Sequence, residues 1–403
     1  MQNKEGNNIL SHPDKSQCCG CTACYAVCPE HAISMQPDKK GFLYPQVNNE
    51  KCINCGLCIK VCDFKIFHPV SGITDFYAVR QKDENEVALS QSGGFSFALA
   101  DYILQQNGVV FGCEMLDAQT VIHKAEITRE GLYRFRGSKY VQSDMGDCFA
   151  QCADYLRSGR VVLFSGTACQ VHGLLSFLSQ KKVPIEHLVT ADLVCHGVPS
   201  PKLWKEYIDQ WNERSNSKIV KVNFRDKNLF GWASHRESFL HEDSTTTTTN
   251  WTNTFYSHVM FRESCHVCPY TTPDRKTDFT LADYWGIAKN APEFDDDKGV
   301  NLLMIHTEKG RMIFEELSSV LDYERTVRET SLQPNLIHPS DKGKGYDRFW
   351  KDYAVLPREK FYNKYFFPSK LKVGLMAVKK KINRCVWLPV RAIRKLWRLL
   401  CNE

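Results

Sequence analysis

Apolar residues in this chain gather in short runs that alternate with longer amphipathic segments. The runs 109–111 and 161–164 contain only Val, Leu and Phe, which predicts strands buried on both faces. Apolar residues at helical spacing occupy residues 95–106 and about 169–178. This alternation of strand and helix predicts a parallel or mixed sheet that is covered by helices.

A further strand is predicted over residues 187–195, and the helix after it has clear start signals. Ser200 suits the N-cap, and Pro201 suits the first helical position. Ligands of such sheets bind at the carboxyl ends of the strands. We therefore expect Cys169 and Cys195, which each follow a strand, to share one edge of the sheet.

The other predicted elements are shorter and less regular. Residues 32–42 are expected to form a short strand and a turn, and residues 220–225 alternate as a strand does. The threonine run 245–249 is expected to be a hairpin loop. Residues 278–286 are expected to form a strand that runs into a glycine turn, and residues 287–365 mix strands and helices without a chemical motif.

The first 72 residues differ from the rest because eight cysteines stand there in two matching runs. Each run has the spacing C-x2-C-x2-C-x3-C, and Pro29 follows the first run. This is the spacing of bacterial ferredoxins with two [4Fe-4S] clusters, in which the fourth cysteine of a run binds the other cluster. We expect that fourth cysteine to open a helix that points away from its own loop.

The crossed pattern assigns four cysteines to each cluster. The first cluster takes Cys18, Cys21, Cys24 and Cys62, and the second takes Cys52, Cys55, Cys58 and Cys28. Cys19 falls outside the spacing and is expected to be a bystander. The alternative is a pair of zinc knuckles, although zinc tolerates looser spacing. Because iron–sulfur clusters move single electrons, the segment predicts a protein that handles electrons.

Composition favours metal ligands over disulfides. The chain has 18 Cys in 403 residues, but its polar start has no apolar signal-peptide segment, so a reducing cytoplasm is expected. No apolar run reaches the length of a membrane span. Residues 369–403 carry ten Lys and Arg against one acid, a balance of +9, which leaves −3 on the rest of a chain of net charge +6. The body is therefore not charged like a nucleic-acid-binding protein.

Four more cysteines form a candidate third site. Cys265 and Cys268 are a CxxC pair, and Cys169 and Cys195 follow two predicted strands. Cys169 falls in the first turn of a helix, where the helix dipole favours a thiolate. From spacing alone, a structural zinc or unrelated buried thiols are equally good interpretations. Five cysteines have no spacing partner and are expected to be ordinary thiols: Cys113, Cys148, Cys152, Cys385 and Cys401.

Five sequence blocks occur in an order that resembles a known family. They are SGTACQ (165–170), VCHGVPSP (194–201), FRDK (224–227), CHVC (265–268) and DFTLADYWG (278–286). Together they resemble the beta-subunit family of coenzyme F420 (deazaflavin) hydrogenases and dehydrogenases, which also includes 7-hydroxymethyl chlorophyll a reductase. The resemblance covers most of residues 1–300. The family pattern has Pro where this chain has Ala168, and Ala is also compatible with a helix start.

The resemblance implies an FAD in the central domain and a third [4Fe-4S] cluster close to it, bound by Cys169, Cys195, Cys265 and Cys268. By the same analogy, the flavin contacts are expected from small residues and their neighbours, whose backbone N–H groups can reach a pyrophosphate. These are Ser92, Gly93, Gly94, Gly137, Ser138, Lys139, Tyr140, Gly166 and Thr167. A plain N-cap is the alternative for residues 92–94.

Lys139 and His196 are the candidate catalytic residues. Lys139 is expected either to stabilise a reduced flavin near N1 or to be a solvated surface lysine. His196 is expected either to donate a proton beside a substrate or to hydrogen-bond a local carbonyl. Asp283 is expected to cap the glycine turn rather than to contact ribose or flavin.

Three segments are expected: an α+β dicluster ferredoxin domain (1–72), a mixed α/β domain that binds FAD and an iron–sulfur cluster (73–365), and a basic amphipathic tail (366–403). The expected function is that of an iron–sulfur flavoprotein oxidoreductase. Its [4Fe-4S] clusters exchange electrons with FAD, and FAD exchanges hydride with an organic substrate or a deazaflavin coenzyme. The alternatives are a non-catalytic electron-transfer subunit of a larger complex and a reductase in polysaccharide biosynthesis.

The expected partners are an external electron donor or acceptor such as ferredoxin, a small-molecule substrate, and a partner subunit or a second copy of the chain. In the tail, Val390, Ile393, Trp397 and Leu400 recur at helical spacing, with cations on the other faces. This pattern predicts either peripheral contact with the inner face of a membrane or a helix docked on protein. The expected location is cytoplasmic, with or without that membrane contact.

Overall fold

The computed structural model describes residues 14–70 and 72–367. The described residues up to Trp350 belong to one compact unit, and those from Lys351 belong to a second. In the second unit, the helix α15 (Arg358–Tyr365) is described, and the Tyr365 hydroxyl donates to Asp352 at 2.6 Å. The predicted amphipathic pattern of the tail, at residues 390–400, lies outside the described residues.

A mixed sheet dominates the described part of the first unit, with eight strands in the order β13-β3-β12-β11-β7-β6-β4-β5. The strands are β3 (Asp75–Gln81), β4 (Val109–Met115), β5 (Val121–Glu126), β6 (Val162–Thr167), β7 (Leu188–Leu193), β11 (Phe279–Asp283), β12 (Asn301–Ile305) and β13 (Leu321–Thr326). Strands β4, β6, β7 and β11 are parallel neighbours, and the outer pairs are antiparallel. The prediction of a parallel or mixed sheet is confirmed.

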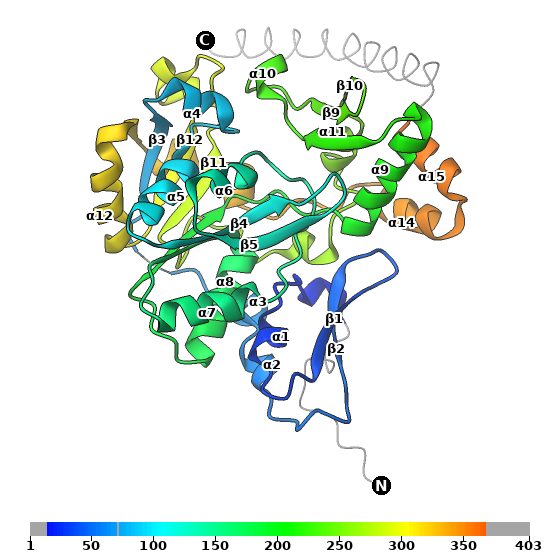
Figure 1. The fold of residues 1–403 in the computed structure, drawn as a ribbon, viewed down its shortest axis with the longest axis horizontal. Helices are drawn as coiled ribbons and strands as arrows, with labels where there is room; N and C mark the ends of the chain where they lie inside the picture. The colour runs from blue at the N-terminus through cyan, green and yellow to red at the C-terminus, as the bar shows by residue number, and fades with distance from the viewer. Residues whose placement is uncertain (1–13, 71, 368–403) are drawn as a thin grey trace, which may run out of the picture. The chain divides into compact units, whose positions relative to one another are not determined.

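Helices cover both faces of this sheet (Figure 1). One face packs against α5 (Phe95–Gln105) and α12 (Glu308–Leu317), and the other against α7 (Cys148–Arg157) and α8 (Ala168–Gln180). Along β6, Leu163 joins the first core, whereas Val162 and Phe164 join the second. Because both faces are buried, the central strands are continuous apolar runs.

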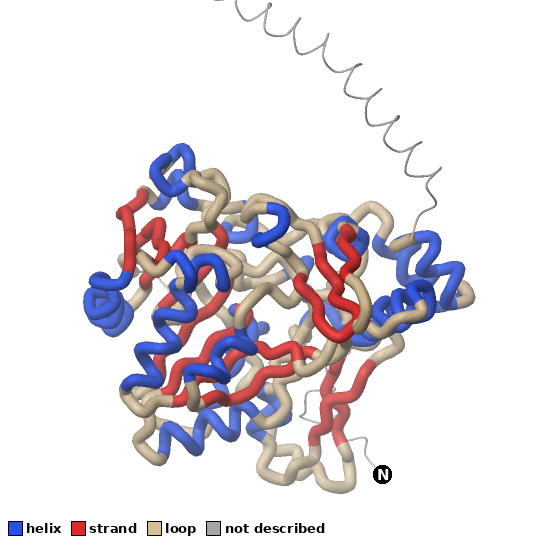
Figure 2. Tube along the Cα trace, turned by 45° about the horizontal axis from the view of Figure 1, so that its top comes forward, coloured by secondary structure: helices blue, strands red, loops and turns tan. Residues whose placement is uncertain are grey.

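Two smaller sheets accompany the main one, and Figure 2 shows their strands in red. The hairpin β1 (Ile33–Pro37) and β2 (Leu43–Val47) lies between the two cysteine runs. The three-stranded sheet contains β8 (Ile219–Asn223), β9 (Glu237–His241) and β10 (Thr245–Thr248). The expectation of a loop at the threonine run was wrong, because these residues pair with β9 as strand β10. Threonine is β-branched and favours strands.

The N-terminal segment shares a hydrophobic core with the α/β part. Its helices are α1 (Ala23–Val27), α2 (Leu57–Lys60) and α3 (Asp63–Ile66). Ala23, Val27 and Val61 pack in the same cluster as α7 and α8. Among the described residues, no helix is long and apolar enough to cross a membrane.

The remaining helices of the described part of the chain are mostly short. They are α4 (Glu84–Leu89), α6 (Arg129–Leu132), α9 (Pro201–Ser215), α10 (Lys227–Phe230), α11 (Asn250–Phe255), α13 (Arg328–Ser331) and α14 (Tyr346–Val355). Helix α9 begins as predicted, because the Ser200 hydroxyl accepts a hydrogen bond from the Leu203 N–H at 3.3 Å and Pro201 is its first residue.

Candidate redox site

The first cysteine run winds around a cavity of about 210 Å³. Gly20 and Thr22 both have left-handed backbone conformations, with φ of 73° and 69°, which turn the loop back on itself before α1. Five cysteines line the cavity: Cys18, Cys19, Cys21, Cys24 and Cys62. All of them except Cys19 are the residues that the crossed pattern assigns to the first cluster.

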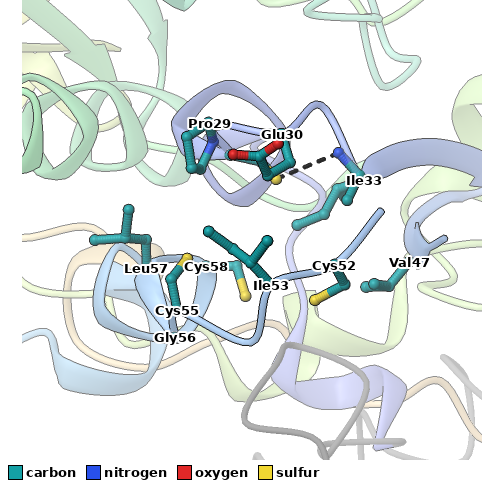
Figure 3. A pocket seen from close by; sticks show the side chains of 12 residues that line it. Pro29, Glu30, Ile33, Val47, Cys52, Ile53, Cys55, Gly56, Leu57 and Cys58 are labelled. Carbon is teal, nitrogen blue, oxygen red and sulfur yellow. Dashed lines mark hydrogen bonds between the residues drawn. The ribbon is translucent and has the colours of Figure 1, made fainter. Parts of the chain in front are cut away.

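The second run repeats this loop conformation around a smaller cavity of about 20 Å³ (Figure 3). Asn54 and Gly56 have φ of 55° and 73°, at the positions equivalent to Gly20 and Thr22. The cysteines that line this cavity are Cys52, Cys55, Cys58 and Cys28. The dashed line in Figure 3 marks the hydrogen bond from the Ala32 N–H to Cys28 Sγ, at 3.4 Å.

The fourth cysteine of each run reaches the other cavity, but only one of the two opens a helix. Cys62 directly precedes α3, as expected. Cys28 instead ends α1, so the expectation that it opens a helix was wrong. Among the described residues, no group of three or more His, Cys, Asp or Glu side chains could hold a single metal ion. Each set of four thiols instead surrounds a cavity, which fits a cluster with one ligand for each iron.

The third cysteine set also comes together, from three separate elements. Cys169 lies in the first turn of α8, Cys195 follows β7, and Cys265 and Cys268 lie in and after the 3-10 turn Glu263–Val267. Burial raises the pKa of the Cys195 thiol to about 11, and the charge of nearby Cys169 acts in the same direction. Burial also raises the pKa of Cys265 and Cys268, and the charges of Cys169 and Cys195 act on both thiols in the same direction.

Cys169 differs from its three partners because hydrogen bonds favour its thiolate. Its pKa is lowered to about 7, first by a hydrogen bond from the Cys19 thiol and also by one from Thr167. The Thr167 hydroxyl lies 3.2 Å from Cys169 Sγ. Thr167 is the N-cap of α8, and its N–H donates to Gln170 Oε1 at 2.9 Å in a capping box.

Cys19, which the spacing left as a bystander, lies between the first and third sets. Its buried side chain packs in one cluster with Cys21 and Cys169. The Gln142 amide donates to the Cys19 carbonyl at 2.9 Å and fixes this part of the loop. The adjacent cysteine pair at residues 18–19 was the one sequence signal for this contact.

The turn at residues 92–94 is closed by the chain itself. The Ser92 hydroxyl donates to the Val300 carbonyl at 2.7 Å, and a Cβ at Gly93 would lie 2.2 Å from the Val79 carbonyl. Gly94 caps α5 with φ of 86°, and the Phe95 N–H donates to Asn301. The plain N-cap interpretation therefore accounts for these three residues without a flavin.

The loop at residues 137–140 is more open. A Cβ at Gly137 would meet no atom within 4 Å, and Ser138 is half-buried. The Lys139 ammonium donates to the carbonyls of Phe135 and Arg136, at 2.8 and 2.9 Å, so it is held by its own loop. The Tyr140 ring stacks on Phe255 with ring centres 4.6 Å apart.

Gly166 and Thr167 end β6 above a buried polar network. A Cβ at Gly166 would lie 3.1 Å from Gln170 Oε1. His123 Nδ1 lies 2.8 Å from the Ser143 hydroxyl oxygen, and His123 Nε2 lies 3.0 Å from the Ser165 carbonyl oxygen. Burial lowers the pKa of His123 to about 4, so this imidazole is neutral near pH 7.

His196 and Asp283 both have side-chain partners that the sequence did not predict. His196 Nδ1 lies 2.7 Å from Asn335 Oδ1, and its Nε2 lies 2.8 Å from His258 Nε2, so neither ring nitrogen uses a local carbonyl. Asp283 ends β11 and pairs with the buried Arg225, while Trp232 Nε1 donates to its other oxygen at 3.1 Å. The expectation that Asp283 only caps a turn was wrong.

The carboxyl ends of the parallel strands thus collect several of the predicted site residues. Thr167 and Cys169 follow β6, Cys195 and His196 follow β7, and Asp283 ends β11. Strands β6, β7 and β11 are adjacent and parallel, so these ends lie along one edge. This is the edge at which open α/β sheets bind their ligands.

Comparison with known proteins finds two family matches in this chain. Residues 17–66 match the 4Fe-4S dicluster domain, and residues 159–327 match the C terminus of the coenzyme F420 hydrogenase/dehydrogenase beta subunit. No curated protein matches. A chain of the F420-reducing [NiFe] hydrogenase complex from Methanosarcina barkeri matches with 17% identity over 73% of this chain and 93% of that chain, with a TM-score of 0.47.

The two family matches cover the segments that contain all three cysteine sets. The chain therefore combines a segment similar to 4Fe-4S dicluster domains with a segment similar to the C terminus of the coenzyme F420 hydrogenase/dehydrogenase beta subunit, and it is related to subunits of oxidoreductases.

Proposed function

We propose that this protein is an iron–sulfur oxidoreductase that carries electrons from the two-cluster segment to the carboxyl edge of the main sheet. In this proposal, twelve cysteines hold three [4Fe-4S] clusters, in the crossed sets assigned above and in the set of Cys169, Cys195, Cys265 and Cys268. An FAD at the same edge exchanges hydride with an organic substrate or a deazaflavin coenzyme. Clusters supply one-electron transfer, and a flavin supplies the conversion to hydride chemistry.

One observation carries the proposal: Cys19 connects the first set to the third. Cys21 belongs to the first set and Cys169 to the third, and the buried Cys19 packs in one cluster with both. Phe64, Phe67 and Tyr270 exclude water around these thiols. A short path of this kind supports electron transfer between groups bound at the two sets.

The residues present fit the clusters better than they fit the flavin. Each cysteine set is assembled in the fold, whereas residues 92–94 are occupied by packing and Lys139 is held by its own loop. The open Gly137 loop and the stacked Tyr140 are the candidate residues that remain available to a flavin. Lys139 and His196 are accordingly proposed to position neighbouring groups rather than to react.

Metal and flavin content after anaerobic purification tests the proposal. We expect about twelve irons, equal acid-labile sulfide and one flavin per chain. About eight irons with a flavin would mean that the third set holds no cluster and is either a group of thiols or a zinc site. Eight irons without a flavin would favour the second candidate function, a non-catalytic electron-transfer subunit of a larger complex, which the relation to a hydrogenase subunit family supports.

A variant separates the third set from the other two. Cys195→Ala is expected to abolish the reduction of flavin at the carboxyl edge by external reduced ferredoxin. The EPR signals of the two N-terminal clusters should persist. Undiminished delivery in this variant would remove the third set from the path. Turnover of a small substrate by the isolated chain then distinguishes an enzyme from an electron-transfer subunit.

A further inference from the structure

Arg262 lies between the first and third cysteine sets and has no exposed surface. Its backbone belongs to the segment that carries the third set, because the Cys265 N–H donates to the Arg262 carbonyl at 3.0 Å. Its side chain enters the first cysteine loop, where Nε donates to the Cys18 carbonyl and Nη2 to the Leu43 carbonyl, both at 2.8 Å. One residue therefore connects the two sets.

The guanidinium also contacts a cysteine of the first set. Arg262 Nη2 lies 3.7 Å from Cys18 Sγ, and Nη1 donates to Gln142 Oε1 at 3.1 Å. The cation lies 4.1 Å from the centre of the Tyr44 ring. Its hydrogen-bond partners in the described part of the chain are neutral oxygens and the Cys18 sulfur, so these contacts leave its charge uncompensated.

The first loop is shaped to admit this cation. A Cβ at Gly20 would lie 2.8 Å from Arg262 Nη1, so a side chain there would push the guanidinium away. Gly20 also has φ of 73°, a conformation that glycine adopts without strain. The close approach is thus built into the sequence of the loop.

The second site has no comparable cation among its lining residues. Glu30 is the charged residue that lines its cavity, and Cys28 Sγ accepts a hydrogen bond from a backbone N–H. The first cavity is lined by Lys15 and Lys65 as well as Asp14, with Arg262 behind the loop. The electrostatic surroundings of the two sites therefore differ in sign.

We propose that Arg262 is a positioning residue that raises the reduction potential of the first cluster above that of the second. The inference rests on the proposed function, because it requires clusters at both sites. Reduction adds negative charge to a cluster, and a desolvated cation with an N–H···S hydrogen bond stabilises that charge. An electron received at the second cluster then moves to the first, beside Cys19 and the third set.

An EPR-monitored redox titration of the anaerobically purified protein tests the inference. In the wild type, the first cluster is expected to be reduced at the higher potential. In Arg262→Gln, the electron equilibrium between the clusters should shift away from the first by at least tenfold, which is about 59 mV for one electron. Cys21→Ser and Cys55→Ser, which each alter one cluster, assign the two signals.

Two further variants control the measurement. Arg225→Gln removes an equally buried guanidinium, 2% exposed and paired with Asp283, and should leave both N-terminal potentials unchanged. Arg262→Lys keeps the positive charge and should retain most of the wild-type potential of the first cluster.

The inference is overturned if the second cluster has the higher potential in the wild type, a result that needs no variant. It is equally overturned if Arg262→Gln retains full iron and both potentials stay unchanged, or if both shift together. A wild-type chain without cluster iron would instead refute the proposed function, so the two failures are distinguishable.

Discussion

The two N-terminal cysteine sets have the same spacing and loop conformation but different surroundings. Thr22 and Gly56, at equivalent positions, have φ of 69° and 73°. The first set lies against α8 and the Arg262 segment, whereas the second has Cys55 exposed and Ile53 62% exposed beside it. Local spacing therefore determines how each loop winds, and tertiary contacts determine whether a site faces solvent or the rest of the protein.

The largest effect is expected from replacing the fourth cysteine of each run, because that residue lines the cavity of the other run. Cys62→Ser should remove about four irons and the first-cluster EPR signal, because Cys62 lines the cavity of Cys18, Cys21 and Cys24. Cys28→Ser should remove the second-cluster EPR signal and leave the first-cluster signal unchanged. Iron analysis and EPR of both variants check this. An effect of Cys62→Ser on the second signal alone would contradict the crossed assignment.

Exposure should make the second cluster the more fragile of the two. Cys55 is exposed, whereas the first set adjoins a core of Phe64, Phe67 and Tyr270. Under limited oxygen or an iron chelator, the second EPR signal should decay at least tenfold faster than the first. The time course of both signals in one sample is the measurement. Equal decay rates would mean that the burial of the first set gives it no protection.

Overpacking between α8 and the first loop should perturb only the first site. A Cβ at Gly173 would lie 2.8 Å from Cys21 Sγ. Gly173→Ala should therefore destabilise the protein by about 1–3 kcal/mol and broaden the first EPR signal. Gly72→Ala, where a Cβ would meet no atom within 4 Å, is the control. Thermal unfolding and EPR check both, and a change in the second signal would show that the sites are not separable.

The smallest expected effect concerns a hydrogen bond that holds the first site against the α/β part. The Tyr270 hydroxyl donates to Asp63 Oδ2 at 2.9 Å, next to Cys62. Tyr270→Phe should cost about 1.5 kcal/mol of folding stability because a buried carboxylate loses a donor. Denaturant unfolding of the loaded protein measures this. Stability equal to that of the wild type would mean that the contact does not hold the segment in position.

The division of the cysteines between two cavities could be predicted because it depends on short-range spacing. The first three cysteines of each run lie within seven residues, so the loop has few ways to wind around a common centre. The shared edge of the sheet could be anticipated for a similar reason. Apolar runs followed by helices, as at residues 161–178, predict a parallel or mixed sheet whose carboxyl edge collects the residues after each strand.

Contacts between distant residues could not be predicted in this way. Arg262 and Cys18 are 244 positions apart, and no local pattern indicates that a buried guanidinium meets a cysteine loop. Asp283 was expected to cap its own turn, but its partner Arg225 comes from a different element, 58 positions away. The threonine run has no apolar alternation that would indicate a strand, because β9, which pairs with it, carries the apolar residues of the hairpin.

The shared core has a consequence for how the protein is made. Ala23, Val27 and Val61 stand close to the cluster cysteines and also complete the packing of α7 and α8. The N-terminal segment is short, and without its clusters it lacks the groups around which its loops are organised. Other small metal-dependent folds do not form without their metal. We therefore expect newly synthesised chains in iron-starved cells to leave this helical face uncovered, so that iron supply controls the abundance of the whole chain through proteolysis.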